Sequence, residues 1–396
     1  MSHVDALNAQ IPRLHDAGKR PLITRNCAIL PFLHFMSPRH TRLHIPGPVE
    51  VSPETYAAMS APMIGHRGKE FQTLYASMQP GLQSLLETTQ PVFLSTSSAW
   101  GIMEGAIRNL SLKRVLCCCS GAFSDKWVDV ARRCGREADA LQFEWGQPID
   151  PSAVQEKLAT GLYDTVTLIH NETSTGVLNP VAEIAAVVRQ FEEVMLVVDT
   201  VSSLSAMPTP AEAWGADVVL AGSQKALALP PGLAIFTVSP RAMERAKSVP
   251  GRGYYFDFLE FLSNHEKDMT PSTPCISTIF GLAHTVKKIE AEGIAARHAR
   301  HAALNALVHE WVTANGFEFF APEGFRSVSL TCVANNRGID VAKLTSLLKS
   351  KHGLAIDGGY GKIKGKTFRL SNMGDETEAT IRHLLACLDD VLPEVC

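Results

Sequence analysis

Short apolar runs alternate with longer amphipathic stretches between about residues 90 and 240. The runs have the length of β-strands, and the stretches between most of them carry apolar residues at helical spacing. Strands that are apolar throughout are buried on both faces, so the pattern predicts an α/β domain with a mostly parallel sheet covered by helices. The expected strands lie at 91–95, 114–119, 165–170, 194–199, 217–222 and 233–238.

The pattern changes after about residue 275. A long helical stretch runs from Ile276 towards Asn315, with candidate breaks at Gly281 and Gly293. Shorter elements follow and predict a smaller α+β domain. They are a strand at 327–333, a helix at 341–353, a strand at 366–372 and a helix at 377–392.

We therefore expect a large domain over 39–280 and a small C-terminal domain over 281–396, linked by a long helix. Residues 1–38 form an extension rich in Arg, His and Pro, with few acidic residues. Such a segment is either a targeting signal, or a poorly ordered tail, or an extension upstream of a natural start at Met36. We favour the last two over a targeting signal.

Composition narrows the function classes. The 396 residues are 45% apolar and 19% charged, with a formal net charge of -3, which suggests neither a nucleic-acid-binding nor a membrane surface. Nine cysteines occur without any CxxC pair, so a structural metal is not expected. The consecutive Cys117, Cys118 and Cys119 are interpreted as small core residues. Free thiols in such numbers fit a reducing compartment, and we expect a cytoplasmic protein.

A lysine follows one predicted strand. Lys225 lies in AGSQKALALPPG (221–232), a segment closed by Pro230, Pro231 and Gly232. A lysine held there could form a Schiff base with a carbonyl cofactor, although it could also be an ordinary loop lysine.

An acidic residue ends another predicted strand. Asp199, in VMLVVDTVSSL (194–204), stands at the carboxyl edge where α/β sheets keep their sites. It could cap the following turn, or it could face the pyridine nitrogen of a cofactor and keep it protonated.

A Ser/Thr-rich turn joins a strand to a helix in STSSAWGIMEGA (95–106). The free backbone N–H groups of Ser98, Ala99 and Trp100 would favour an anion there. No GxGxxG is present, so a dinucleotide is not the expected ligand. The Trp100 ring could stack on a flat cofactor.

Together these segments resemble the class V pyridoxal-phosphate aminotransferases of fold type I, in the branch of the alanine–glyoxylate and serine–glyoxylate (serine–pyruvate) enzymes. The resemblance covers about residues 42–390. It rests on IPGPVEVSPE (45–54), PMIGHRGKEF (62–71), STSSAWGIMEGA, HNETSTGVLNP (170–180), VVDTVSSL, GSQKALALPPG, RGYYFDF (252–258), TPSTP (270–274) and GKTFRLSNMG (365–374). Each piece alone is weak, but their order and spacing together are specific.

The resemblance implies a role for each matching residue. Lys225 would hold pyridoxal 5′-phosphate covalently and shuttle the proton, and Asp199 would pair with the pyridine nitrogen. The other cofactor-binding residues would be Ser98, Ala99 and Gln224 at the phosphate, Trp100 and Phe123 over the ring, and Thr173 near its phenolic oxygen. Thr273 would complete the phosphate site of the partner subunit, which implies a homodimer with shared active sites.

Substrate binding is assigned to Arg369 and Gly47. Arg369 matches the family's carboxylate-binding arginine, and its planar guanidinium suits a carboxylate. Gly47, in IPGPVEVSPE, would lie beside the substrate. Ser371 and Asn372 depart from the family's usual residues and leave the substrate open.

These assignments predict a ping-pong aminotransferase. The donor would be a small amino acid, alanine or serine, and the acceptor an oxoacid, glyoxylate or pyruvate. Three alternatives stay open. They are a ureidoglycine–glyoxylate aminotransferase, a cysteine desulfurase-like lyase, and a non-catalytic cofactor-binding subunit. Relatives of the lyase type usually carry His before the lysine, where this chain has Gln224.

Overall fold

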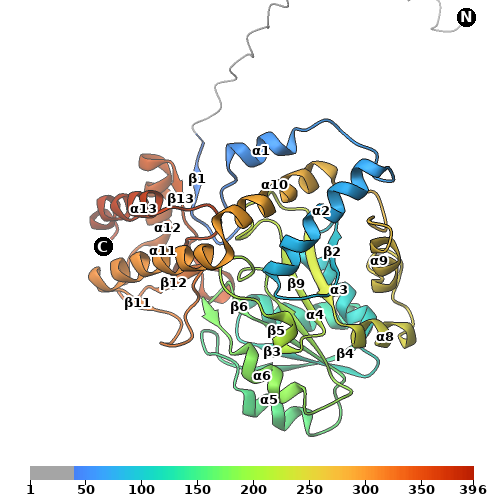
Figure 1. Cartoon of the computed structure of the whole chain (residues 1–396). Helices are drawn as coiled ribbons and strands as arrows, with labels where there is room; N and C mark the ends of the chain where they lie inside the picture. The colour runs from blue at the N-terminus through green and yellow to red at the C-terminus, as the bar shows by residue number, and fades with distance from the viewer. Residues whose placement is uncertain (1–39) are drawn as a thin grey trace, which may run out of the picture. The chain divides into compact units, whose positions relative to one another are not determined.

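The computed structural model describes residues 40–396, and residues 41–396 form one compact unit. The expected extension at 1–38 lies outside the described residues. In the described part, the main sheet has seven strands and is parallel except at β10 (Figure 1). Their spatial order is β2 (Val92–Ser95), β10 (Ala234–Val238), β9 (Val218–Gly222), β8 (Met195–Asp199), β5 (Thr165–Ile169), β3 (Arg114–Cys119) and β4 (Glu137–Gln142).

Six of these strands confirm the predicted apolar runs. The seventh, β4, was missed because its sequence EADALQ is polar and half of its side chains are exposed. It lies at the edge of the sheet beside β3, where only one neighbouring strand covers it. The α/β fold with a mostly parallel sheet is confirmed.

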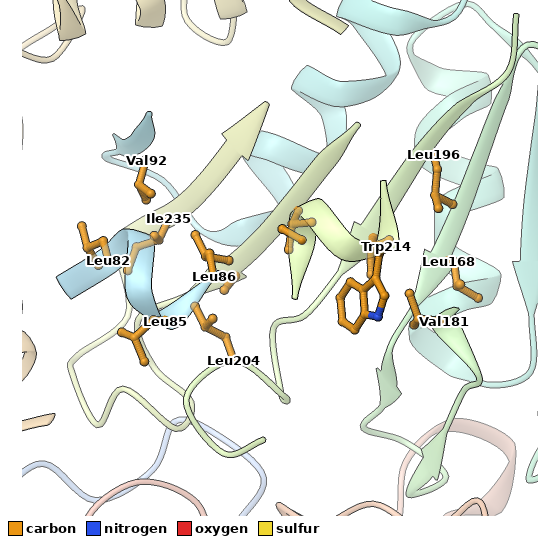
Figure 2. Packing of buried hydrophobic residues seen from close by; sticks show 14 of the residues in the cluster. Leu82, Leu85, Leu86, Val92, Leu168, Val181, Leu196, Leu204, Trp214 and Ile235 are labelled. Atoms are coloured by element: carbon orange, nitrogen blue, oxygen red, sulfur yellow. The ribbon is translucent and has the colours of Figure 1, made fainter. Parts of the chain in front are cut away.

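Alternate residues of each strand face opposite helical layers, because side chains alternate along a strand. Leu196 and Val198 of β8 join one apolar cluster, while Met195 and Val197 join the other. Figure 2 shows part of the first cluster, in which Trp214 and Leu204 lie with residues of the sheet. The consecutive cysteines follow the same rule: Cys118 faces the first cluster, whereas Cys117 and Cys119 face the second.

Helices cover both faces of the sheet. The first cluster draws on α2 (Lys69–Leu85), α5 (Pro151–Leu158), α6 (Val181–Val188), α7 (Ala211–Trp214) and α10 (Ile276–Glu292). The second draws on α3 (Ala99–Leu110), α4 (Ala122–Arg133), α8 (Pro240–Ser248) and α9 (Phe258–His265). The short α1 (Pro53–Met59) packs against α10.

The C-terminal residues have an apolar cluster of their own between α11 (Ile294–Ala314), α13 (Glu378–Val391) and a three-stranded antiparallel sheet. The sheet consists of β11 (Glu318–Phe319), β12 (Leu330–Ala334) and β14 (Thr367–Ser371). Smaller elements are α12 (Val341–Leu347) with a π-turn at Leu348–His352, 3₁₀ turns at Gly361–Ile363 and Leu392–Glu394, and the pairs β1 (Arg42–Leu43) with β13 (Leu354–Ala355) and β6 (Asn171–Glu172) with β7 (Val177–Leu178). The boundary near residue 280 stays a prediction.

Helix α10 ends at Gly293, as one candidate break predicted. The other candidate, Gly281, was wrong, because this glycine lies inside α10. A Cβ there would lie 2.8 Å from Met59 Cγ and 2.9 Å from Leu229 Cδ2, so Gly281 allows close packing and does not end the helix. Among the described residues, no helix has both the length and the apolar composition needed to cross a bilayer.

Candidate active site

A cavity of about 220 Å³ opens beyond the carboxyl ends of the parallel strands, where α/β folds place their ligands. All the residues predicted from the sequence line it except Thr273 and Arg369. The lining residues are Gly47, Ser98, Ala99, Trp100, Met103, Phe123, Ile169, Asn171, Thr173, Asp199, Val201, Gln224 and Lys225.

Lys225 is buried in the tight loop after β9, where the Ala228 N–H donates to the Lys225 carbonyl at 2.8 Å. Its Nζ donates to the Pro46 carbonyl. Gly47 has φ +110, and a Cβ there would lie 2.6 Å from Lys225 Cδ, so only glycine leaves room for this lysine.

Burial and, to a lesser extent, the charge of Arg369 lower the pKa of Lys225 to about 8. Asp199 and Asp357 oppose the shift. An amine with this pKa is partly neutral near neutral pH, as a lysine that attacks a carbonyl group must be.

Asp199 ends β8 and is buried, with its Oδ1 accepting the Val201 N–H at 2.8 Å. Burial raises the pKa of this carboxyl group to about 7, the Val201 N–H opposes the shift, and the charge of Glu172 adds to it. A buried carboxylate with so little compensation is stabilised by a cationic partner. A protonated pyridine ring would be such a partner.

The anion-binding turn is formed by the start of α3. Ser98 is its N-cap residue, and the Ser98 side chain makes no capping hydrogen bond. The first N–H groups of a helix have no partner within it, so Ala99 and Trp100 present donors at the positive end of the helix dipole. This arrangement suits a phosphate group.

Two buried side-chain oxygens, Gln224 Oε1 and Asn171 Oδ1, have no hydrogen-bond donor among the described residues. Asn171 Nδ2 donates to the Ser202 carbonyl at 3.1 Å, and this acceptor fixes the orientation of the amide. Both residues line the cavity. Unpaired buried polar atoms of this kind indicate a site made for a polar ligand.

Aromatic side chains flank the cavity. Trp100 is half-buried, and its ring lies 6.3 Å from that of Trp127. Phe123 stacks on Tyr360 with 5.1 Å between ring centroids. Thr173 Oγ1 lies 2.7 Å from Ser202 Oγ at the inner wall. A flat aromatic ligand would find apolar ring surfaces on its flank and hydroxyl groups beside it.

Arg369 lies next to the cavity on β14, and its Nη1 donates to the Thr173 carbonyl at 2.8 Å. The guanidinium therefore contacts Thr173, which lines the cavity, but does not line the cavity itself. Thr273 is exposed, its Oγ1 lies 3.3 Å from His66 Nε2, and it does not line the cavity of its own chain.

Several supporting residues were missed by the sequence analysis. Glu172 of β6 is fully buried. Its carboxylate accepts the Ser124 N–H in the first turn of α4 at 2.9 Å and the Ser174 hydroxyl at 2.6 Å. Arg297 donates through Nη2 to the Ala226 carbonyl at 2.6 Å and so holds the residue next to Lys225. Glu172 and Asn171 follow a predicted strand directly, a signal that could have identified them, whereas nothing in the sequence ties Arg297 to the lysine loop.

Within residues 40–396, no group of three or more His, Cys, Asp or Glu side chains is arranged so that it could hold a metal ion. Cys117, Cys118 and Cys119 are buried, and burial raises the pKa of the Cys117 thiol to about 12. These thiols are therefore protonated and inert at neutral pH.

Comparison with known proteins supports the same reading of the cavity. The family model "Aminotransferase class-V" matches residues 54–381. An uncharacterized aminotransferase of Methanocaldococcus jannaschii is 36% identical over 89% of this chain and 93% of its own, and an L-aspartate–glyoxylate aminotransferase of Paracoccus denitrificans is 32% identical over 89% and 91%. The crystal structure of an alanine–glyoxylate aminotransferase from Nostoc sp. has a TM-score of 0.86 and 27% identity over 91% of this chain and 97% of its own.

Proposed function

The chain belongs to the class-V aminotransferase family and is a pyridoxal-phosphate-dependent transaminase, and we propose that it moves an amino group from alanine or serine to glyoxylate or pyruvate in a ping-pong cycle. One observation carries this proposal. A buried lysine, a buried carboxylate and a helix N-terminus line one cavity, with an arginine directly behind its wall. This set fits the cofactor, which supplies a reactive aldehyde and an electron-accepting ring when it is bound.

Each residue of the site would have a separate role in the reaction. Lys225 would hold the cofactor, and its Nζ would carry the proton between the substrate Cα and the cofactor, in one direction in each half-reaction. Asp199 would keep the ring nitrogen protonated, while the N–H groups at the start of α3 and the amide of Gln224 would bind the phosphate. Arg369 would bind the α-carboxylate that donor and acceptor share.

The lyase alternative receives less support from the thiols of the chain. A desulfurase needs an accessible nucleophilic cysteine. No cysteine of the described residues lines the cavity, and burial raises the pKa of Cys332 to about 12. No observation favours the ureidoglycine alternative or the non-catalytic alternative over the proposed function.

The half-reactions test the function directly. Alanine or serine should bleach the visible absorption band of the holoenzyme, and glyoxylate or pyruvate should restore it. In Arg369→Lys, kcat/KM should fall by about ten- to a hundredfold in both half-reactions, because lysine keeps the charge but loses the paired N–H donors. Cofactor affinity should change little.

A loss confined to one half-reaction would contradict this role, because Arg369 would then bind a side chain and not the shared carboxylate. Lys364→Arg, on the exposed segment before β14, is a matched control and should leave both half-reactions unchanged.

We further propose a homodimer in which each subunit completes the active site of the other. Thr273 is exposed and lies outside the cavity of its own chain, on a segment whose Thr270 and Pro271 carbonyls accept hydrogen bonds from Arg67. The large apolar side chains of Met63 and Tyr254 are also exposed, by 70% and 60%, as interface residues are in an isolated subunit.

In a crystal structure of the holoenzyme, Thr273 should lie closer to the partner subunit's Lys225 than to the lysine of its own chain. Sedimentation should give a dimer, and Thr273→Ala should weaken cofactor binding. A fully active monomer would contradict the shared site.

A further inference from the structure

The proposed carboxylate-binding arginine is already paired. Arg369 Nε donates to Asp357 Oδ1 at 2.8 Å, and Nη2 lies 2.8 Å from the same oxygen. Nη1 donates to the Thr173 carbonyl. One edge of the guanidinium is therefore occupied, and an incoming carboxylate is left with the edge formed by Nη1 and Nη2.

The fold holds Asp357 in this position from several sides. The Arg369 N–H donates to the Asp357 carbonyl at 2.7 Å, and the Gly359 N–H donates to Oδ1 at 2.8 Å. Gly359 has φ +88, and a Cβ there would lie 2.7 Å from the Thr367 carbonyl oxygen, so the path of this turn requires glycine. The side-chain hydrogen bonds from Arg369 Nε and from the Gly359 N–H both go to Oδ1, and within residues 40–396 Oδ2 of Asp357 accepts none.

The pair is sheltered from water and acts on the reacting lysine. The Arg369 side chain is 4% exposed and that of Asp357 27%, so screening of their charges is incomplete. Both charges act on Lys225, whose pKa Arg369 lowers and Asp357 raises. The same two charges therefore reach a substrate bound between the pair and the lysine.

The charge balance at this place disfavours a second anion on the donor. Asp357 neutralises Arg369 before the substrate arrives, and the α-carboxylate then brings the local sum to one negative charge. Among the lining residues described above, the only cation is Lys225, which the cofactor uses. The stacked pair of Phe123 and Tyr360 lies beside the arginine, with the Tyr360 ring centroid 5.7 Å from Arg369 Cζ. A second carboxylate would find no partner there.

We propose that Asp357 is a specificity-determining residue, which makes this site select amino donors with an uncharged side chain and reject dicarboxylic donors such as aspartate. The proposal rests on the proposed transaminase function. Specificity would come from one attraction and one repulsion. Arg369 attracts the α-carboxylate of every amino acid, whereas Asp357 repels the second negative charge of a dicarboxylic amino acid.

The test compares Asp357→Asn with the unaltered holoenzyme in the first half-reaction. Asparagine keeps the shape and an oxygen for the Gly359 N–H but loses the charge. The kcat/KM for L-alanine relative to L-aspartate should fall about tenfold or more, the scale of one screened charge–charge interaction. Most of the change should be a gain with L-aspartate, and the visible band of the covalently held cofactor should still be present.

Asp129→Asn is the matched control. Asp129 pairs with Arg133 on the exposed face of α4, and both side chains are at least half exposed, so its removal should leave the ratio unchanged. A ratio within twofold of the unaltered value in Asp357→Asn would overturn the inference. If the unaltered enzyme transaminated no amino acid at all, the proposed function would fail instead.

A second measurement needs no variant. In the unaltered holoenzyme, propionate should compete with L-alanine more strongly than succinate at the same concentration, because succinate carries the second charge. Equal or stronger competition by succinate would also overturn the inference, even if Asp357→Asn failed to fold.

Discussion

Lys225→Ala should give a folded protein that has lost transamination by about a thousandfold or more. The variant removes both the group that holds the cofactor and the base that moves the Cα proton, and a positioned base alone contributes about 10²–10⁴-fold. The fold should survive, because within residues 40–396 the lysine amine donates only to the Pro46 carbonyl and the loop keeps its backbone hydrogen bonds.

Absorbance and single-turnover assays check this result. The variant should lack the visible band of the covalently held cofactor while its circular dichroism stays native. Lys157→Ala, an exposed lysine of α5, is the control and should keep full activity. Transamination near the normal rate in Lys225→Ala would remove the basis of the proposed mechanism.

Asp199→Asn should bind the cofactor and yet lower the rate of the first half-reaction by about 100-fold or more. A neutral amide cannot hold the ring nitrogen protonated, so the ring accepts electrons less well. The buried position makes the loss large, because no water stands in for the missing charge. Arg369→Lys should act on substrate affinity, whereas this change should act on the rate of Cα–H cleavage.

Deuterium at the donor Cα makes the test specific. In Asp199→Asn the isotope effect on the half-reaction should be fully expressed, because proton removal becomes rate-limiting. A deprotonation rate close to that of the unaltered enzyme would show that the carboxylate has a structural role only.

The sequence predicts the sheet because its central strands are apolar on both faces, a signal that needs no tertiary information. It fails at β4, whose exposed edge position removes that signal, and at Gly281, whose role is visible only when Met59 and Leu229 are packed against it. Within the site, too, the sequence identifies residues whose local position is distinctive. Lys225 follows a predicted strand and Asp199 ends one, so both could be found by position.

The supporting residues could not be found in this way. Asp357 is ordinary in sequence, and its pairing with Arg369 depends on a backbone bridge between two segments of the C-terminal part. Arg297 lies 71 positions from the Ala226 carbonyl that it holds. Reactive residues at or after strand ends can be predicted from the local sequence, whereas the residues that position them and shift their pKa values come from distant segments.

The segment that faces Lys225 follows a strand that pairs with a distant part of the chain. Arg42 and Leu43 pair with Leu354 and Ala355, and a few residues later the Pro46 carbonyl receives the lysine amine. During synthesis on a ribosome, residues 42–43 leave the exit tunnel about 310 residues before their strand partner at 354–355. The strand that leads into this wall of the cavity therefore cannot pair until residues 354–355 have emerged, so a nascent chain carries this edge unpaired while the segment between them is made.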